Sequence, residues 1–416
     1  MMSDLVYKRK ICRLCNSPDL VLALPLKASA LADEFLPKEM LHKEQPTYPL
    51  DLFLCKKCGF SQLVDIVIPK AIYIDYMYET VSSLGLVEHF KRYAKEIVTE
   101  LSLGKDDLVV DIGSNDGSLL RAFKSNGTKV LGVDPAREIA KKATESGIET
   151  LPDFFTLELA QKITQSHGKA NVITANNIYA NVDELEPLTL AIRELLADDG
   201  VFVFESFYTL EWIKNMVFDF MYHEHLSYFS VKPVQEFFDR LGMELVDVWP
   251  IPTKGGSIRC FIQKKNGKRK IKPSVEKYIA DEKAFKLHDL ETYKKFENEI
   301  NIRKQAVLDY INPLLASGKT IAGFGASATT TTLMYHFELE GKITFIADDY
   351  KVKQNTFSPG HHIPVLPPEA IYEKNPDYIF IFAWRYTDPI VAKHQKFLDQ
   401  GGKFIVPLPN LKIIEK

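Results

Sequence analysis

A strand, a glycine turn and a helix start follow one another at residues 109–120, and this stretch constrains the fold more than any other. A β-branched run ends there at Asp111, and Gly113 and Gly117 come before an apolar pattern of helical period. Glycine lets the backbone turn sharply and lets a ligand approach it closely. A second apolar run ends at Asp134, where a carboxylate can bind both hydroxyls of a ribose. The pattern predicts a ligand-binding βαβ unit, with an ordinary βα turn as the alternative.

The spacing of these residues resembles that of class I methyltransferases, which bind S-adenosylmethionine (SAM). The match is the D-x-G-x-x-x-G string together with the acid of the second strand, and the G-x-G start of dinucleotide-binding folds is missing. Later residues fall where such enzymes place an acid and a ring against adenine, or amides at the same sheet edge, but these could also be turn residues. The candidate cofactor-binding residues are Asp111, Gly113, Asn115, Gly117, Asp134, Asp153, Phe154, Asn176 and Asn177.

Length and composition point to a soluble protein of several domains. A chain of 416 residues is too long for one ordinary core, so two or three domains are expected. The apolar and charged fractions, 46% and 26%, are typical of globular proteins, and the net charge of −3 argues against general binding of nucleic acid or anionic membranes. The N-terminus has no apolar signal core, and no later run could span a bilayer. We expect a cytoplasmic monomer.

Four of the five cysteines form two C-x-x-C pairs, Cys12 with Cys15 and Cys55 with Cys58. Each pair can place two thiolates on one side of a tight turn, and two such turns complete a tetrahedral shell for Zn²⁺. Four cysteines leave no open coordination position, so the metal would be structural and would replace the core that so short a segment lacks. Two redox pairs are the alternative, but no βαβ pattern surrounds either of them.

Strand and helix signals alternate over residues 108–248, with late strands near 243–249 and 257–263, and again beyond residue 320. Such alternation predicts a parallel sheet with helices on both faces and the ligand at the carboxyl ends of the strands. We therefore predict an α/β protein with two Rossmann-like doubly wound domains plus a small N-terminal zinc-binding domain. The predicted boundaries are 1–72 for the zinc-binding domain, 73–250 for the first Rossmann-like domain and 251–416 for the second.

The segment 218–229 carries the densest set of reactive side chains. His223 and His225 flank Glu224 there, which could form a metal site, but no third ligand of known spacing is present. His225 is more attractive as a general base, because imidazole titrates near neutral pH and Glu224 or Tyr222 could orient it. Catalysis, metal binding and buried aromatic packing all stay open at this point.

The string from Tyr222 to Phe229, with both cysteine pairs and the first glycine turn, resembles the sugar C-3 C-methyltransferases. These enzymes build branched deoxysugars by methylating nucleotide-diphosphate 4-keto-6-deoxy sugars. The likeness also includes residues 255–259, 323–328 and 404–409, and so it covers nearly the whole chain in the order of the family. The combination of these strings, rather than any one of them, carries the resemblance.

The resemblance implies roles for the residues around the base. His225 matches the proposed base, Tyr222 and Glu224 match its neighbours, and Tyr76 matches a tyrosine that reaches over the sugar. The chain departs from the family at Asn181, where a histidine is common. Asparagine can hydrogen-bond to a hydroxyl or keto oxygen but cannot shuttle protons near neutral pH, which is compatible with a different substituent or configuration on the sugar.

The chemistry of such a reaction fits these residues independently. Methylation of carbon requires a carbanion, and a hydrogen α to a ketone is acidic enough for a positioned base to remove. The enolate oxygen then needs hydrogen-bond donors, each worth about 3 kcal/mol. Transfer from a sulfonium depends mainly on holding the carbon near the methyl group. No metal is needed, in agreement with a closed zinc site far along the sequence from His225.

The C-terminal part of the chain has a second strand and glycine turn. Gly323-x-Gly325-x-x-Ala328 followed by Asp348 approximates a dinucleotide fingerprint, so an NAD-dependent sugar-nucleotide dehydrogenase is the alternative from another enzyme class. The resemblance implies instead that this helix N-terminus binds the diphosphate of the sugar nucleotide. A structural domain, or a zinc scaffold without catalysis, are further alternatives. The substrate-binding residues that the resemblance implies are Lys254, Ser257, Arg259, Gly325, Ser327, Gln354, Trp384 and Tyr386.

Overall fold

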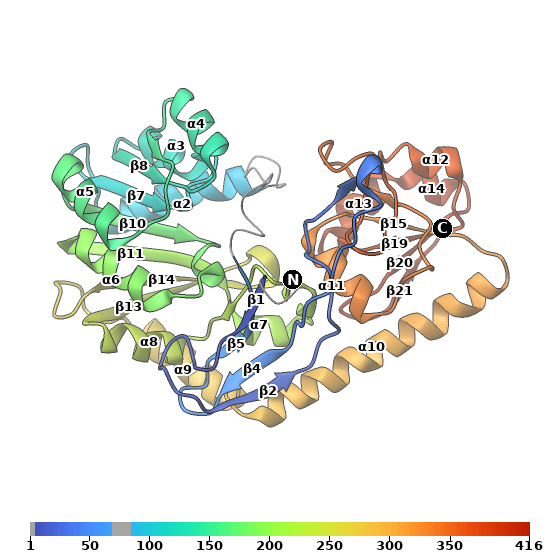
Figure 1. The fold of residues 1–416 in the computed structure, drawn as a ribbon, viewed down its shortest axis with the longest axis horizontal. Coiled ribbons are helices and arrows are strands. Elements are labelled where there is room, and N and C mark those ends of the chain that lie inside the picture. Colours follow the sequence, from blue (N-terminus) through green and yellow to red (C-terminus); the bar gives the residue numbers. More distant parts are fainter. Residues whose placement is uncertain (1–4, 69–84) are drawn as a thin grey trace.

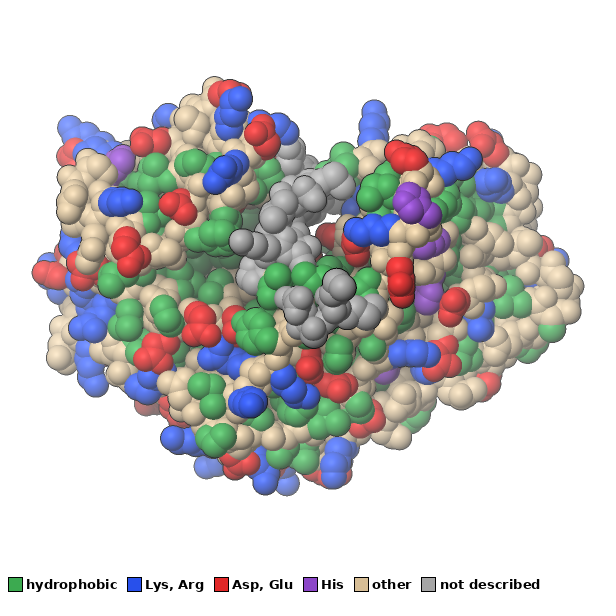
Figure 2. All heavy atoms as spheres, in the orientation of Figure 1, with side chains coloured by type: hydrophobic (Ala, Val, Ile, Leu, Met, Phe, Trp, Pro, Cys, Tyr) green, Lys and Arg blue, Asp and Glu red, His purple; other side chains and the backbone are tan. Residues whose placement is uncertain are grey.

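The computed structural model describes residues 5–68 and 85–416, which form two lobes joined by a small N-terminal sheet and a long helix (Figure 1). We call residues 86–285 the first lobe and residues 320–416 the second lobe. Figure 2 shows an indentation between the lobes, with basic and acidic side chains interspersed over the face in view. Tyr76 and the segment around it lie outside the described residues.

The first lobe is built on a seven-stranded sheet in the order β13-β14-β11-β10-β7-β8-β9, in which β14 is antiparallel to its neighbours. Adjacent residues of β7 face opposite sides of this sheet, because side chains alternate along a strand. Val109 packs in one apolar cluster with the helices α2 and α3, and Val110 packs in another with α5 and α6. The strands are β7 (Leu108–Ile112), β8 (Lys129–Val133), β9 (Thr150–Leu151), β10 (Ala170–Asn176), β11 (Leu196–Phe207), β13 (Met243–Ile251) and β14 (Ser257–Lys264).

Helices cover both faces of this sheet, as the alternation of signals predicted (Figure 1). They are α2 (Leu86–Leu101), α3 (Ser118–Ser125), α4 (Arg137–Glu145), α5 (Leu157–His167), α6 (Leu185–Leu195), α7 (Thr209–Lys214), α8 (Val231–Arg240) and α9 (Pro273–Phe285), with the 3-10 turns η4 (Tyr179–Asn181), η5 (Phe218–Phe220) and η6 (Thr253–Gly255). The predicted domain boundary at residues 250/251 falls inside β13, before its last residue, Ile251. Since β13 and β14 pair with each other, and β14 also pairs with β11, the sheet continues past that boundary.

The N-terminal segment contacts both lobes. Its strands are β1 (Val6–Lys8), β2 (Leu20–Leu24), β3 (Leu36–Pro37), β4 (Leu52–Cys55), β5 (Ser61–Leu63) and β6 (Asp65–Val67), with one 3-10 turn, η2 (Lys38–Met40). The sheet β12-β5-β4-β2 includes β12 (Ser227–Tyr228) from the first lobe. Strand β3 pairs instead with β17 (Thr356–Phe357) of the second lobe. The N-terminal segment therefore holds the two lobes at a common junction.

The second lobe contains a six-stranded sheet in the order β18-β16-β15-β19-β20-β21, parallel except for β21. Strand β16 is short, because only Ile346–Ala347 pair with β15. The elements of this lobe are β15 (Ile321–Phe324), α11 (Ala328–His336), β16 (Ile346–Ala347), β17, β18 (Val365–Leu366), α12 (Ala370–Lys374), β19 (Tyr378–Ile381), η7 (Trp384–Tyr386), α13 (Thr387–Lys393), α14 (Gln395–Asp399), β20 (Lys403–Val406) and β21 (Lys412–Ile414).

Helix α10 (Leu290–Ala316) runs from the first lobe to the second along one edge of the molecule (Figure 1). Its 27 residues correspond to a length of about 40 Å. Tyr293, Phe296 and Ile300 form a buried stripe at helical spacing, and the hydroxyl of Tyr293 pairs with that of Ser61 in β5 at 2.5 Å. Within the described ranges, no helix combines the length and the apolar character needed to cross a membrane.

Candidate active site

The carboxyl ends of β7 and β8 form a cradle built around two acids. Asp111 is buried at the end of β7, and the Thr174 hydroxyl donates a 2.5 Å hydrogen bond to its carboxylate. Burial raises the pKa of Asp111 to about 7, and the charge of Asp134 adds to the increase. At the end of β8, the carboxylate of Asp134 accepts hydrogen bonds from the backbone of Asn115 at 2.8 Å and of Ala136 at 2.9 Å. Asp134 is thus fixed against the glycine turn.

The glycine turn adopts the left-handed backbone conformation that its two glycines allow. Gly113 and Gly117 have φ angles of +71° and +75°, a region that residues with a Cβ rarely enter. A Cβ added at Gly113 would also lie 2.4 Å from the Cδ1 atom of Ile178. The backbone therefore lies too close to its neighbours at this position for any other residue.

Polar groups without protein partners line the same sheet edge. In the described part of the chain, both amide atoms of Asn176 and the Oδ1 atom of Asn177 are buried without a hydrogen-bond partner. Unpaired buried amides are costly, and a polar ligand would satisfy them. Beyond β9, Asp153 accepts a hydrogen bond from the backbone of Phe154, whose side chain is 56% exposed. The unpaired amide atoms of Asn176 and Asn177 fit a polar ligand such as SAM at this sheet edge.

The segment 218–229, which we call the histidine loop, holds His225 in one tautomer. The Nδ1 atom of His225 lies 2.8 Å from the carbonyl oxygen of Phe220, which can only accept a hydrogen bond, so Nδ1 carries the proton. The Nε2 atom then keeps its lone pair. The ring of Tyr222 lies over the imidazole with a centroid distance of 4.0 Å, and Phe207 lies at 4.8 Å. Burial and the charge of Lys254 lower the pKa of His225 to about 3, so the imidazole is neutral at physiological pH.

His223 is directed to a different place. Its Nε2 atom lies 3.2 Å from the carbonyl oxygen of Tyr48 in the N-terminal segment, and its ring packs edge-on against the Tyr48 ring. The two histidines of the loop therefore do not converge on one point. Over residues 5–68 and 85–416, the cluster of His, Cys, Asp or Glu that could hold a metal ion is the set of four cysteines. The geometry does not support the metal alternative for the histidine loop.

Charged groups from all three parts of the chain meet beside His225. Burial raises the pKa of Glu224, and Asp33 of the N-terminal segment adds to the increase. Lys353 of the second lobe donates hydrogen bonds to Asp33 at 2.8 Å and to the carbonyl oxygen of Ala326 at 2.9 Å. Lys254, in η6, is held at a φ of +55°, and burial lowers its pKa to about 8, while Glu205 and Glu224 oppose the decrease. This junction is where β3, the histidine loop and the second lobe come together.

Asn181 lies at the end of η4, next to the histidine loop. The backbone N–H of Leu226 donates to the carbonyl oxygen of Ala180 at 2.9 Å, which links the two segments directly. The Oδ1 atom of Asn181 is buried and has no hydrogen-bond partner among the described side chains and backbone. The structure therefore brings Asn181 close to the segment that carries His225, with an acceptor still to be satisfied.

The second lobe repeats the acid-and-turn arrangement of the first. Gly325 has a φ of +100° at the end of β15, and Ser327 caps α11 through a capping box with Thr330. Asp348, at the end of β16, accepts hydrogen bonds from the backbone of Ala326 at 2.5 Å and of Tyr350 at 2.7 Å. The turn thus presents a helix N-terminus at the carboxyl edge of the sheet, where an anionic group can bind.

Other predicted substrate-binding residues already have protein partners. Arg259 is 1% exposed and forms ion pairs with Glu205 at 3.0 Å and with Glu96 at 2.8 Å, with Tyr93 stacked on its guanidinium. The hydroxyl of Ser257 donates to the Thr253 carbonyl, and the amide of Gln354 donates to the Asp348 carbonyl. The indole of Trp384 donates to Asp219, whereas Tyr386 is 47% exposed. Arg259 and Trp384 therefore contribute to the framework of the site.

The four cysteines converge on one point. Their sulfur atoms all lie within 4.8 Å of one another, with Cys12 and Cys58 at 3.7 Å and Cys15 and Cys55 at 3.6 Å. Four thiolates around one Zn²⁺ at tetrahedral angles lie about 3.8 Å apart, given Zn–S bonds of about 2.3 Å. The donor set and spacing fit a structural zinc ion, which Cys12, Cys15, Cys55 and Cys58 would hold.

Several residues of the site gave no usable signal in the sequence. Asp33 and Lys353 are far apart in the chain and stand in no motif, yet they form an ion pair at 2.8 Å. Asp219 was within the histidine loop, but its ion pair with Arg385 joins the two lobes, which no local pattern indicates. Glu205 could have been found, because an acid at the end of the fourth strand occupies the same sheet edge as Asp111 and Asp134.

Three family models match successive parts of the chain. Residues 12–73 match a zinc binding domain, residues 86–248 match a methyltransferase domain, and residues 252–409 match the C-methyltransferase C-terminal domain. The chain is 31% identical to the C-methyltransferase NovU of Streptomyces niveus over 414 residues, which cover 99% of each protein. These matches favour a SAM-dependent methyltransferase over the dehydrogenase and over a scaffold without catalysis.

Solved methyltransferase structures resemble about half of the chain at low identity. A magnesium protoporphyrin IX methyltransferase from Synechocystis PCC 6803 with bound SAH is 15% identical, with a TM-score of 0.34 over 47% of this chain and 92% of that one. A SAM-dependent methyltransferase from Clostridium acetobutylicum is 14% identical, with a TM-score of 0.34 over 47% and 96%. The prediction from the sequence strings is confirmed by the full-length match to NovU: the chain belongs to the family of SAM-dependent C-methyltransferases with an N-terminal zinc-binding domain.

Proposed function

We propose that the protein transfers the methyl group of SAM to carbon 3 of a nucleotide-diphosphate 4-keto-6-deoxy sugar, in the biosynthesis of a branched deoxysugar. One observation carries the proposal. His225 keeps its Nε2 lone pair because Nδ1 donates to the Phe220 carbonyl, and the ring lies where the first lobe meets the second lobe. A cytoplasmic location and a monomeric state stay predictions.

The proposed reaction begins with proton transfer to His225. The Nε2 atom removes the C-3 hydrogen of the sugar, and the electron pair of the broken C–H bond delocalises onto the adjacent C-4 carbonyl oxygen as an enolate. Bound SAM supplies an electrophilic methyl group, and carbon 3 attacks it as the carbon–sulfur bond breaks. The ketone is restored, and the proton stays on the imidazole until it is released to solvent. The chain contributes mainly by holding the two reacting carbons close together.

The charges around His225 support enolate formation. The ammonium of Lys254 and the amide of Asn181 are the nearby groups that can donate to a C-4 oxygen, and a donor in such a site is worth about 3 kcal/mol. The helix α11, which begins just after Ser327, can offer backbone N–H groups of its first turn to the diphosphate. Tyr76 as a cover over the sugar stays a prediction from the resemblance.

Hydrogen exchange in deuterium oxide tests this proposal separately from methyl transfer. We expect the wild-type enzyme to methylate one member of a panel of 4-keto-6-deoxy sugar nucleotides and to exchange the C-3 hydrogen of that sugar. His225→Asn should abolish both activities while SAM still binds. His223→Asn, two residues away and directed at Tyr48, is the matched control and should retain both. Exchange at normal rates in His225→Asn would mean that another group takes the hydrogen.

A further inference from the structure

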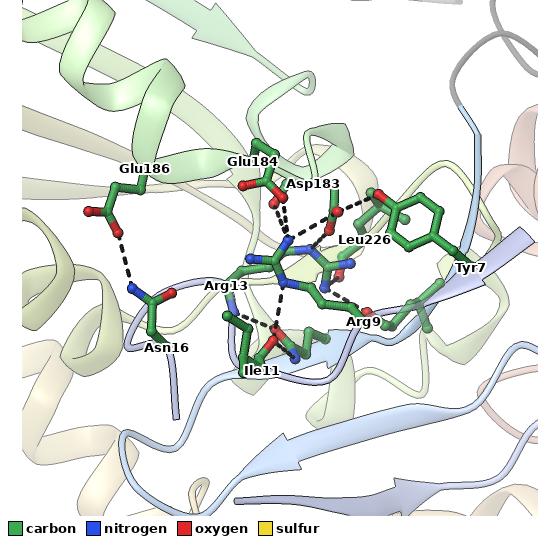
Figure 3. Close-up of polar contacts among 11 residues, drawn as sticks. Tyr7, Arg9, Ile11, Arg13, Asn16, Asp183, Glu184, Glu186 and Leu226 are labelled. Carbon is green, nitrogen blue, oxygen red and sulfur yellow. Dashed lines mark hydrogen bonds and ion pairs between the residues drawn. The ribbon is translucent and has the colours of Figure 1, made fainter. Parts of the chain in front are cut away.

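Arg13 lies inside the first cysteine pair, between Cys12 and Cys15, but its side chain leaves the metal site. It is 1% exposed and extends into the contact between the N-terminal segment and the first lobe (Figure 3). A buried arginine requires partners for its charge and its donors, because desolvation of an unpaired guanidinium is costly. The identity of these partners indicates what Arg13 does.

Two partners of the Arg13 side chain, Leu226 and Asp183, belong to the two segments that carry candidate catalytic residues. Its Nη1 atom donates to the carbonyl oxygen of Leu226, which follows His225, at 3.0 Å, and to that of Leu63 at 2.6 Å. Its Nε atom donates to the carboxylate of Asp183, two residues beyond Asn181, at 2.8 Å. One rigid planar group therefore bridges the histidine loop and the segment after η4.

Further contacts hold the same two segments against the N-terminal segment. The Leu226 carbonyl also accepts from the backbone of Leu63 at 3.0 Å, which continues the pairing of β12 with β5. The second carboxylate oxygen of Asp183 accepts from the Tyr7 hydroxyl at 2.5 Å and pairs with Arg9 at 3.0 Å. Figure 3 shows these side chains converging on Asp183 from the N-terminal segment. Leu226, next to His225, and Asp183, close to Asn181, are thus both fixed by residues of the N-terminal segment.

We propose that Arg13 is a positioning residue that fixes the position of His225 relative to Asn181. We further propose that the turn at residues 12–15, which we call the zinc knuckle, serves in part to hold Arg13 in place. Cys12 and Cys15 flank Arg13, so an ordered knuckle fixes the backbone of Arg13. Leu226 and Asp183 fix its guanidinium group through hydrogen bonds. Arg13 does not touch the sugar or SAM in this account. The part that concerns catalysis rests on the proposed role of His225, whereas the coupling between the segments does not.

Three variants test the inference, together with an arginine that acts as a matched control. Arg13→Lys keeps the charge but cannot reach Leu63, Leu226 and Asp183 at once, and Asp183→Asn removes the charge of the partner without changing its shape. Arg13→Gln is the stronger change. Arg240→Gln is the control, because Arg240 donates to the carbonyl of Leu14 in the same knuckle at 2.8 Å and pairs with Glu186, away from the histidine loop.

We expect Arg13→Lys and Asp183→Asn to retain one zinc ion per chain and to bind SAM normally. The kcat for methyl transfer should fall about 10²-fold, with little change in KM, because a small displacement of a base costs about that factor. In hydrogen exchange followed by mass spectrometry, amides of residues 179–183 and 222–229 should exchange faster than in the wild type. Arg240→Gln should match the wild type in kcat and in exchange of both segments.

Each result that would contradict the inference can be told apart from the others. If Arg13→Lys and Asp183→Asn keep the wild-type kcat and exchange pattern, Arg13 does not position the loop. If Arg13→Lys loses zinc in proportion to kcat, its role is only to support the metal site. If Arg13→Gln fails to fold, Asp183→Asn still decides. If the wild type methylates no sugar of the panel, the proposed function fails, and the exchange of residues 179–183 and 222–229 alone confirms or refutes the coupling.

Discussion

Two buried ionisable side chains, His225 and Glu224, and the half-buried Lys254 determine the chemistry that this site can perform. His225 is kept neutral by burial and by the nearby charge of Lys254, which lower its pKa to about 3. The pKa of Lys254 is lowered to about 8 by burial, and Glu224 is shifted in the opposite direction by its own burial. A neutral base beside a cation suits proton abstraction next to a carbonyl, since the cation stabilises the charge that develops on oxygen.

These pKa shifts predict the pH dependence of kcat/KM. His225 is in its basic form above its lowered pKa, so its own titration should not lower kcat/KM on the acid side until the pH approaches about 3. A change in kcat/KM near pH 7 would instead report the protonation of Asp111. Lys254 is charged only below its pKa, so kcat/KM should fall as the pH rises through about 8. In Lys254→Arg, whose guanidinium stays charged, this fall should disappear, and Lys254→Met should be slow at every pH.

Other charged groups also interact with Lys254, namely Glu224, Glu205 and Arg385. The decrease in kcat/KM at alkaline pH therefore has to be assigned to one of these groups or to Lys254 itself. Although burial opposes it, the hydrogen bond with His89 and the charge of Arg259 lower the pKa of Glu205, so Glu205 stays charged across this range. Glu224→Gln should therefore move the alkaline midpoint without removing it. An unchanged alkaline limb in Lys254→Arg would assign the fall to another group.

At the scale of elements, both lobes use the same strand–turn–helix unit with the same acid. Asp134 and Asp348 each accept two backbone N–H groups, one from the glycine turn of the preceding strand and one from two residues further along their own chain. The positive φ angles at Gly113 and Gly325 make both turns possible. The turns are local features of the sequence, and for this reason their positions and the strands before them could be predicted.

Gly113→Ala tests whether the first turn must stay free of side chains. The added Cβ would meet Ile178 at 2.4 Å and would also occupy a φ of +71°. We expect the Kd for SAM, measured by calorimetry, to rise more than about 10-fold, since overlap and backbone strain together exceed about 1.4 kcal/mol. Gly127→Ala is the control, because Gly127 has a φ of +93° but nothing within 4 Å of its Cβ position. Equal SAM affinity in wild type and Gly113→Ala would contradict this account of the turn.

Elements that depend on distant partners were harder to predict. The fold class and the late strands near residues 243–249 and 257–263 followed from the strand and helix signals of the sequence and are confirmed by the structure. Strand β16 is limited to two residues because only Ile346 and Ala347 find partners in β15 and β18. The pairing of β3 with β17 and of β12 with β5 leaves no periodic signal, since each joins short segments far apart in the chain.

At the scale of the whole molecule, contacts between the two lobes hold the candidate site together. Among the contacts described above, those of Asp219 are the most deeply buried. Its carboxylate accepts from the indole of Trp384 at 2.9 Å and pairs with Arg385 at 3.2 Å, while Arg385 lies over the Phe220 ring. Thr332 of α11 also donates to the Met221 carbonyl at 2.7 Å. The histidine loop is therefore fixed by the second lobe as well as by the N-terminal segment, and the candidate site could not have been assembled from any one domain.

Asp219→Ala should weaken the junction between the lobes. Removing one member of a buried pair leaves Arg385 without its counter-charge, which typically costs about 3 kcal/mol or more. We expect a lower thermal midpoint and a lower kcat, with the SAM affinity of the first lobe largely retained. Asp349→Ala provides the comparison, because its pair with Lys393 is about half exposed and surface pairs contribute less than about 1 kcal/mol. Equal losses of stability in the two variants would refute this role for Asp219.

The contact between β3 and the second lobe has a consequence for how the protein is made. Asp33 leaves the ribosome 320 residues before Lys353, its partner across this contact. The stretch around Asp33 must therefore wait without this partner until Lys353 has been synthesised, although segments that are made earlier commonly fold first. A segment made early is in this way completed late, and a product truncated before Lys353 would lack the junction on which the site depends.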